Sequence, residues 1–312
     1  VYYTGIVRDK QGRKMSKSLG NSPDPIELMK EFGADGVRVG MLLTSPAGND
    51  LPFDNSLCEQ GRNFANKIWN SMRLIQGWEH TDATSSEVDK VSIAWMRSRL
   101  NQVIEEQEKS FADFRISEVL MSNYKLIWDD FCSWFLEMIK PSYGEGISSE
   151  TYKESISIFE DILKLLHPFM PFLSEEIWHI IGDRGGKEDA LVVAPWPAAR
   201  AIDNEILNDF EYFSQLVSAL RNVRKENNIS FKEELELKVK QNESVTSRFA
   251  PVITKMCNLS SMEEVSEKVG QSYSFLVKSN EYFIPMSGDV DVAKEAEKIK
   301  ENAIELIHTL VK

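Results

Sequence analysis

Cysteine, long apolar runs and positive charge are all scarce in this sequence of 312 residues. The three cysteines, Cys58, Cys132 and Cys257, stand far apart without a CxxC or a Cys/His spacing, which argues against a disulfide framework and against a zinc site. No apolar run approaches the roughly 20 residues that a membrane-spanning helix needs, and we expect no signal peptide, because the first residues lack its pattern of a charged start, an apolar stretch and a cleavage site. We therefore expect a soluble, cytoplasmic chain with neither a membrane nor zinc among its partners.

The net charge of −13 at pH 7 would by itself argue against a polyanionic partner, because phosphate contacts need lysine and arginine. The basic residues are unevenly spread, however. Residues 1–20 carry one acidic residue, Asp9, and five basic ones: Arg8, Lys10, Arg13, Lys14 and Lys17. A cationic patch therefore stands at the N-terminal end of an acidic chain. Because the chain opens on Val1 rather than on methionine, we expect it to be a piece of a longer protein.

Hydrophobic periodicity predicts a mainly α fold. After a short strand and a polar loop, the sequence predicts a helix from Asp24 or Pro25 to Gly33 and a second helix from Ala34. Apolar residues then recur at three- and four-residue steps through most of the next 140 residues, which predicts an α-helical bundle. Residues 187–201 hold two prolines around a tryptophan and are interpreted as a crossing linker.

The spacing of the hydrophobic residues changes after the predicted bundle and the helix that follows it. A long helix is expected from about Asn204 to Asn227, and alternating or β-branched runs then predict strands, with a helix over 243–257 covering one face. The expected strands are 235–239, 273–277 and 281–286. Heptad spacing from Val292 to Leu310 predicts the start of a coiled-coil helix after this small α/β module. The predicted domains are residues 1–54, 55–200, 201–288 and 289–312.

The most informative string is KMSKSLGN, which comprises Lys14, Met15, Ser16, Lys17, Ser18, Leu19, Gly20 and Asn21. Two lysines three residues apart, with hydroxyl groups between them on a glycine-bounded loop, can place two ammonium groups and several donors around a triphosphate. A generic K-x-x-K loop is usually only solvated, but the full string is too specific for an accidental match. We interpret it as a phosphate clamp that closes when a nucleotide arrives, so that its binding energy is expressed in the transition state.

This string resembles the KMSKS signature of the class I aminoacyl-tRNA synthetases, and DPIELMKEFGADGVRVGMLL at 24–43 resembles the stem-contact region of the same family. Among the isoleucine, leucine and valine members, GNDLPF at 48–53 and GRNFANKIWN at 61–70 are most similar to the valine members. HPFMPFLSEEIW at 167–178 is common to all three, and SGDVDVAKEAEKIKE at 287–301 resembles the lead into the coiled-coil arm of the valine members. The resemblance therefore covers essentially the whole chain.

The resemblance implies a role for each loop residue. In the family, the second lysine of the signature stabilises the pyrophosphate leaving group as the amino acid attacks the α-phosphate of ATP, and Lys17 matches that position. Lys14 and Ser16 are expected to add ground-state and closing contacts, Met15 to pack the loop or touch adenine, and Ser18 to complete the ATP-binding set. The implied cofactors are ATP, as a substrate, and Mg²⁺ held mainly by the phosphates and by residues absent from this chain.

The resemblance also implies that the bundle binds the anticodon of tRNA(Val), with ATP and valine as the other substrates of a monomeric parent enzyme. The candidate tRNA contacts are polar side chains on two helices: Arg62, Asn63, Asn66 and Lys67 on the first, and Arg221, Arg224 and Lys225 on the second. An ordinary solvated helix face is the alternative for both groups.

The preferred hypothesis is the C-terminal part of a class I synthetase that activates valine. The nucleotide-binding HIGH motif, the amino-acid pocket and the editing domain of the family would all lie upstream of Val1. We therefore expect the 312-residue chain to be catalytically inactive by itself. Two alternatives stay open, namely the equivalent region of an isoleucine or leucine enzyme, and a non-catalytic tRNA-binding protein derived from a synthetase.

Overall fold

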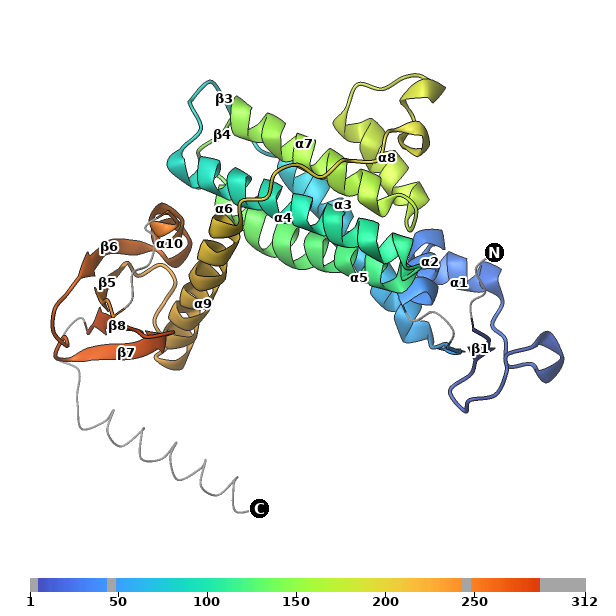
Figure 1. Cartoon of the computed structure of the whole chain (residues 1–312), viewed down its shortest axis with the longest axis horizontal. Coiled ribbons are helices and arrows are strands. Elements are labelled where there is room, and N and C mark those ends of the chain that lie inside the picture. The colour runs from blue at the N-terminus through green and yellow to red at the C-terminus, as the bar shows by residue number, and fades with distance from the viewer. Residues whose placement is uncertain (1–4, 44–48, 243–247, 287–312) are drawn as a thin grey trace, which may run out of the picture. The chain divides into compact units, whose positions relative to one another are not determined.

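The computed structural model describes residues 5–43, 49–242 and 248–286 (Figure 1). The chain divides into two compact units, Val1–Phe210 and Glu211–Lys312, which are described separately below. The coiled-coil helix predicted for residues 289–312 lies outside the described residues. The four domains predicted from the sequence stay a prediction.

The first unit begins with two short parallel strands and two short helices. Strand β1 (Val7–Arg8) pairs with β2 (Leu51–Pro52), and the long loop between them contains α1 (Pro25–Phe32) and α2 (Ala34–Leu43). The side chain of Asp24 accepts a hydrogen bond of 2.8 Å from the Ile26 amide, so it caps α1 in front of the proline. Gly33 follows the helix at φ +76°, a conformation that favours glycine. Both predicted helices are confirmed.

The predicted helical bundle follows. Its helices are α3 (Asn55–Gln76), α4 (Glu87–Ala112), α5 (Ile116–Lys125), α6 (Leu136–Ile139), α7 (Ser149–Leu166) and α8 (Pro171–Ile181). Strands β3 (His80–Thr81) and β4 (Ile147–Ser148) pair in parallel and join the start of α7 to the loop after α3. The largest buried side chains of the bundle are aromatic: Trp95, Phe64, Phe131, Phe135 and Phe159. The bundle is therefore held by apolar burial, as the periodicity predicts.

A π-helical stretch, Leu126–Phe135, connects α5 to α6, so the predicted helix that ends near Pro141 is continuous but not regular. The hydroxyl of Ser133 donates to the carbonyl of Trp128, five residues earlier, at 2.7 Å. The apolar spacing of this helix gave no sign of the wider turn, because residues three to five positions apart still reach the same core.

Helices α2 and α3 approach each other more closely than ordinary side chains permit. A Cβ atom on Gly61 would lie 2.2 Å from the Gly36 carbonyl oxygen, and one on Gly40 would lie 2.7 Å from the backbone nitrogen of Cys58. These glycines are therefore required for packing, and they fix the N-terminal region against the bundle.

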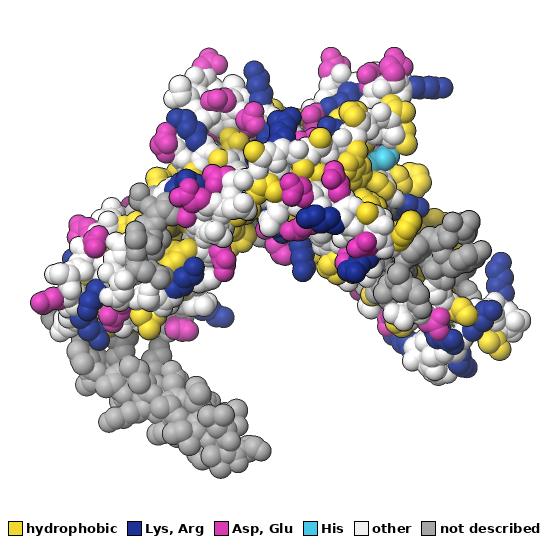
Figure 2. All heavy atoms as spheres, in the orientation of Figure 1, with side chains coloured by type: hydrophobic (Ala, Val, Ile, Leu, Met, Phe, Trp, Pro, Cys, Tyr) yellow, Lys and Arg dark blue, Asp and Glu magenta, His cyan; other side chains and the backbone are white. Residues whose placement is uncertain are grey.

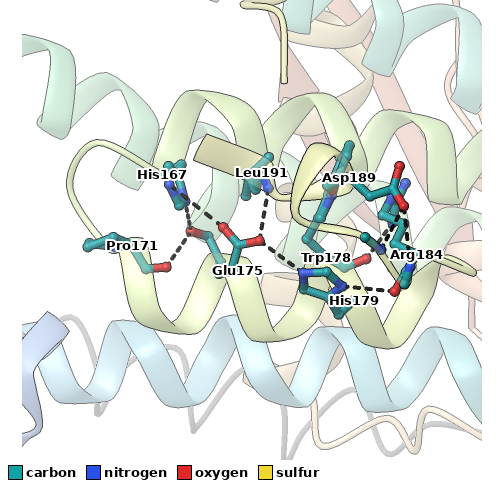
Figure 3. A network of polar contacts seen from close by, with 11 residues as sticks. His167, Pro171, Glu175, Trp178, His179, Arg184, Asp189 and Leu191 are labelled. Carbon is teal, nitrogen blue, oxygen red and sulfur yellow. Dashed lines mark hydrogen bonds and ion pairs between the residues drawn. The ribbon is translucent and has the colours of Figure 1, made fainter. Parts of the chain in front are cut away.

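Helix α8 contains most of the HPFMPFLSEEIW string, and a polar network holds it (Figure 3). Glu175 accepts a hydrogen bond of 2.9 Å from the Leu191 amide, and its carboxylate lies 3.1 Å from Nε2 of His179 and 4.0 Å from Nε2 of His167. The Arg184 guanidinium stacks on the Trp178 ring, 3.5 Å from its centroid. Burial lowers the pKa of His167, so this histidine is a neutral structural residue.

In the second unit, the described residues form a mixed four-stranded sheet with two helices. Strands β5 (Leu235–Lys240), β6 (Leu259–Glu264), β7 (Ser272–Val277) and β8 (Asn280–Pro285) lie in the order β6-β5-β8-β7. Strand β5 is parallel to β6 and antiparallel to β8, which forms a hairpin with β7. Helix α9 (Asn204–Glu226) enters this unit, and α10 (Ala250–Cys257) precedes β6. The stack of Phe213 on Phe249, with centroids 5.0 Å apart, joins α9 to the start of α10.

The three predicted strands of this unit are confirmed, but β6 was not predicted. Its sequence is LSSMEE, and four of its six side chains are exposed. An edge strand of this kind lacks the apolar alternation by which strands are found in a sequence. Helix α10 confirms the second half of the helix expected over 243–257, and residues 243–247 lie outside the described residues.

Candidate functional site

The KMSKS string lies in the loop between β1 and α1, which Figure 1 shows standing out from the N-terminal end of the first unit. A tight turn begins the loop. The Asp9 carboxylate accepts hydrogen bonds from the backbone amides of Gln11 and Arg13, at 3.0 and 2.9 Å, and from Nε of Arg13 at 2.9 Å. Gly12 completes the turn at φ +77°. The hydrogen bond that Asn21 Nδ2 donates to Asp9 Oδ2 at 2.9 Å, and then these bonds from Arg13 and Gln11, favour the ionised carboxylate and lower the pKa of Asp9 far below its ordinary range.

The signature itself is a short extended segment followed by a 3-10 turn at Lys17–Leu19. The amide of Met15 donates to the Val7 carbonyl at 3.0 Å, which ties the loop back to β1. The hydroxyl of Ser16 accepts from the amide of Leu19 at 3.3 Å, and Gly20 ends the turn at φ +66°. The alternation of serine and glycine in the sequence thus specifies a defined turn in this segment.

The five basic side chains of the loop fall into two groups. Three of them make ion pairs with carboxylates: Arg8 with Asp50, Lys10 with Asp54, and Arg13 with Asp9. Within the part of the chain that the structure describes, the ammonium groups of Lys14 and Lys17 make no ion pair or hydrogen bond, and both side chains are exposed. Figure 2 shows basic side chains standing out from this end of the unit. The two lysines are therefore available to an anion, while the other cations are already neutralised.

A groove of about 420 Å³ lies beside the loop. It is lined by Asp9, Lys10, Met15, Gly20, Asn21, Ser22, Pro23, Phe53, Asp54 and Asn55. Met15 is half-buried and packs against the small apolar cluster that includes Leu28, Phe32 and Phe53. This contact supports the packing role that the sequence analysis considered for Met15.

Two carboxylates at the far side of the loop, Asp50 and Asp54, also have lowered pKa values. The hydrogen bond and ion pair from Arg8 lower the pKa of Asp50, and the bond from Lys10 at 2.7 Å lowers the pKa of Asp54 to about 2. Both carboxylates are therefore ionised at neutral pH and fix their cations in place.

The first group of predicted tRNA contacts lies along α3. Asn63 and Asn66 are exposed, whereas Arg62 and Lys67 are half-buried. The Arg62 guanidinium pairs with Glu59 at 3.2 Å and lies 5.5 Å from the Phe32 ring centroid, and Lys67 Nζ lies 5.4 Å from that of Trp128. The structure thus brings these four residues together on one helix. Their contact with tRNA stays a prediction.

The structure divides the second group. Arg221 and Lys225 are exposed on α9, but Arg224 is only 5% exposed. The guanidinium of Arg224 donates to four backbone carbonyls at 2.7–3.3 Å, those of Ser230, Glu233, Cys257 and Asn258. Its burial corrects the expectation that Arg224 lies on an open helix face, and we assign it a structural role. Spacing along a helix could not reveal that the chain folds back over this residue.

Comparison with known proteins gives matches along the chain. The family described as tRNA synthetases class I (I, L, M and V) matches residues 1–54, and the anticodon-binding domain of tRNA ligase matches residues 94–240. A valine–tRNA ligase of Christiangramia forsetii is 54% identical over 302 residues, which cover 96% of this chain and 34% of the relative. The corresponding protein of Phocaeicola vulgatus is 50% identical over 300 residues, covering 96% and 34%. That of Bacillus subtilis is 33% identical over 315 residues, covering 96% and 36%.

Among solved structures, the ternary complex of Agrobacterium radiobacter K84 agnB2 LeuRS, tRNA and LeuAMS covers 64% of this chain and 24% of that chain, with 23% identity and a TM-score of 0.48.

The signature loop, the helical bundle and the matches to both family models are those of the class I tRNA synthetases. Within that class the chain belongs to the valine–tRNA ligase family, since relatives that carry this name match almost all of it at up to 54% identity. This finding favours the valine hypothesis over the isoleucine and leucine alternatives. The chain spans about a third of the length of the curated relatives it matches.

Proposed function

We propose that this chain supplies the ATP-clamping loop and the tRNA-binding bundle of an enzyme that activates valine with ATP and transfers it to tRNA(Val). The observation that carries the proposal is that the ammonium groups of Lys14 and Lys17, at the two lysine positions of the signature, have no partner among the described residues. The resemblance to valine–tRNA ligases over 96% of the chain supports the choice of amino acid.

The proposed role of the lysines depends on where negative charge develops during the reaction. As valine attacks the α-phosphate of ATP, the bond to the pyrophosphate breaks and negative charge grows on the leaving oxygens. An ammonium group that approaches those oxygens late in the reaction stabilises the transition state more than the bound substrate. We assign this role to Lys17, and assign to Lys14, Ser16 and Ser18 the contacts that draw the loop onto the triphosphate.

Among the described residues, the side chains near the loop do not fit a resident metal ion. In residues 5–43, 49–242 and 248–286, no group of three or more histidine, cysteine or acidic side chains could hold one. Near the loop, the carboxylates of Asp9 and Asp54 are already paired with Arg13 and Lys10. We therefore propose that Mg²⁺ arrives with ATP and is bound by its phosphates.

The proposed location is the cytoplasm, and the proposed parent enzyme is a monomer. All three cysteines are free and buried, which suits a reducing compartment. In the described parts of the chain, every helix is too short or too polar to span a bilayer.

Valine-dependent exchange of pyrophosphate into ATP tests the activation step. We would place the 312 residues in the matching segment of the Christiangramia forsetii relative, and compare this chimera with the 312-residue chain alone. The chimera should catalyse valine-dependent exchange. The chain alone should be inactive, because positioning ATP in line with valine needs more than a loop with two lysines. Exchange by the chain alone would contradict the proposal.

Filter binding of tRNA(Val) tests the second half of the proposal. The net charge of −13 predicts weak binding by the 312 residues, because acidic side chains repel the tRNA phosphates. The affinity should fall as salt rises from 50 to 200 mM, because bound cations release counterions from the phosphates. An affinity that does not change over this range would contradict an electrostatic contact.

A further inference from the structure

We propose that Asn21 is a positioning residue of the clamp: its carboxamide, braced by Asp9, holds the backbone that carries Lys14 and Lys17 in one conformation before nucleotide binds. The inference rests on the proposed function of the loop. Asn21 is half-buried, lies at the end of the loop and lines the groove beside it.

Three hydrogen bonds from one side chain cross the loop. Oδ1 of Asn21 accepts from the backbone amide of Ser16 at 2.9 Å. Its Nδ2 donates to the backbone carbonyl of Lys14 at 3.2 Å and to Oδ2 of Asp9 at 2.9 Å. The residues that flank Met15 are therefore held on either side by a single amide group, and that group is anchored in turn to the tight turn of Asp9.

The chemistry of the partners requires an amide at position 21. A backbone N–H can only donate, whereas a carbonyl and an ionised carboxylate can only accept, so the three partners fix which end of the amide is oxygen and which is nitrogen. An aspartate would place a second carboxylate against Asp9 and would leave the Lys14 carbonyl without its donor. An alanine would leave all three groups without this partner.

Apolar packing contributes little to the shape of the signature. Met15 is the only residue of the five-residue signature that the described structure packs against an apolar cluster, and the remaining four are polar or exposed. Small displacements of a catalytic charge reduce rate strongly, because the group must already stand where charge develops. Ordering the backbone in advance also lowers the conformational entropy that closing would otherwise cost.

A double-mutant cycle in the chimera tests whether Asn21 acts through Lys17. We expect Asn21→Ala to lower kcat of valine activation by about 10- to 100-fold, with the KM for valine changed less than about twofold. If the residue works by positioning Lys17, the double variant Asn21→Ala/Lys17→Ala should be no slower than Lys17→Ala alone. Effects that multiply would overturn the inference, and so would an Asn21→Ala enzyme with full kcat.

Two comparisons separate this inference from the proposed function. If Lys17→Ala retains full exchange, the proposed function of the loop has failed. If Lys17→Ala loses exchange while Asn21→Ala does not, only the present inference has failed. Asn55→Ala is the matched control, because Asn55 lines the same groove but is exposed, and it should leave kcat within about twofold of the parent value.

Amide hydrogen exchange on the 312-residue chain provides a readout that does not depend on activity. In Asn21→Ala the amide of Ser16 should exchange at least about fivefold faster, since its acceptor is gone, while amides of the bundle core keep their protection. In Asn55→Ala the Ser16 amide should exchange as in the parent chain. An unchanged Ser16 amide in Asn21→Ala would show that the side chain does not hold the loop.

Discussion

The signature loop and the helical bundle are stabilised by different forces. In the bundle, aromatic side chains such as Trp95, Phe131 and Phe159 are almost wholly buried, so the fold depends on apolar area. In the loop, side chains bond to backbone groups and cations pair with carboxylates, and Lys14 and Lys17 contribute no packing. The comparison suggests that the residues proposed for chemistry can change without unfolding the chain, whereas the residues that hold the bundle cannot.

The largest expected effect is on the bundle. Phe159 on α7 is fully buried and stacks on Phe131, with ring centroids 5.2 Å apart. Phe159→Ala should reduce the free energy of unfolding by about 3–5 kcal/mol, because it removes buried area and leaves a cavity. Phe172→Ala on α8 is the matched control, since that ring is 66% exposed and should cost much less. Urea unfolding followed by circular dichroism measures both, and equal costs would contradict the assignment of the core.

The second prediction concerns the loop, where we expect a substitution to reduce activity strongly and to leave stability almost unchanged. Lys17→Ala in the chimera should reduce valine-dependent pyrophosphate exchange by roughly 10²–10³, comparable to the loss of one preorganised charge-stabilising donor. Its melting temperature should stay within about 1 °C of the parent value, because the side chain is exposed and pairs with none of the residues that the structure describes.

Lys10→Ala is the control for that prediction. Lys10 is on the same loop, but its ammonium group is already paired with Asp54 at 2.7 Å. Exchange should therefore fall far less than in Lys17→Ala. If the two variants lost activity equally, the loop would act by its total charge and not through one placed lysine.

The sequence was most informative where the signal was local. The cap at Asp24, the glycine at position 33 and the apolar stripes of the bundle helices are determined by neighbouring residues, and the structure confirms the elements they predicted. The pairing of Arg8 with Asp50 and of Lys10 with Asp54 could not be predicted, since each joins residues more than 40 positions apart. The string alone therefore located the proposed clamp but could not say which of its cations are paired.

The same limit explains Asn21 and Arg224. Asn21 stood in the signature string, yet its three hydrogen bonds depend on how the loop turns back on itself. Arg224 shared the helical spacing of Arg221 and Lys225, but its carbonyl partners come from segments after α9 and at the end of α10. In both cases the residue type allowed several roles, and only the path of the backbone decided between them.

The third prediction tests the structural role assigned to Arg224 in the second unit. Arg224→Ala should lower the free energy of unfolding of this unit by about 1–3 kcal/mol, because buried carbonyls lose their donor. Lys225→Ala removes a neighbouring charge that is exposed, and should change stability by less than about 0.5 kcal/mol. Hydrogen exchange of β5 and β6 amides would localise the loss. An Arg224→Ala chain as stable as Lys225→Ala would restore the arginine as a candidate surface contact.

The smallest expected effect is the pH dependence of stability at the loop, and its sign is opposite to that expected at the start of α2. The pKa of Asp54 is lowered to about 2, so its contribution to stability is present above the ordinary value of 3.8 and is lost as pH falls toward 2. Burial raises the pKa of Asp35 at the start of α2, so its contribution has the opposite sign and is lost as pH rises above 3.8. The amide of Ser56 donates a hydrogen bond of 2.9 Å to Asp54, so its hydrogen-exchange protection shows whether Asp54 is ionised and in place.

We expect the protection factor of the Ser56 amide to be constant between pH 7 and pH 4 and to fall below that range. Asp54→Asn should remove most of this dependence, because an amide does not ionise and cannot pair with Lys10. The control is Asp82→Asn, an exposed aspartate for which the structure gives no ion pair, and it should leave the profile unchanged. If the Ser56 profile of Asp54→Asn matched that of the parent chain, the Lys10–Asp54 pair would not be what orders this side of the loop, and the proposed division between neutralised and available cations would fail with it.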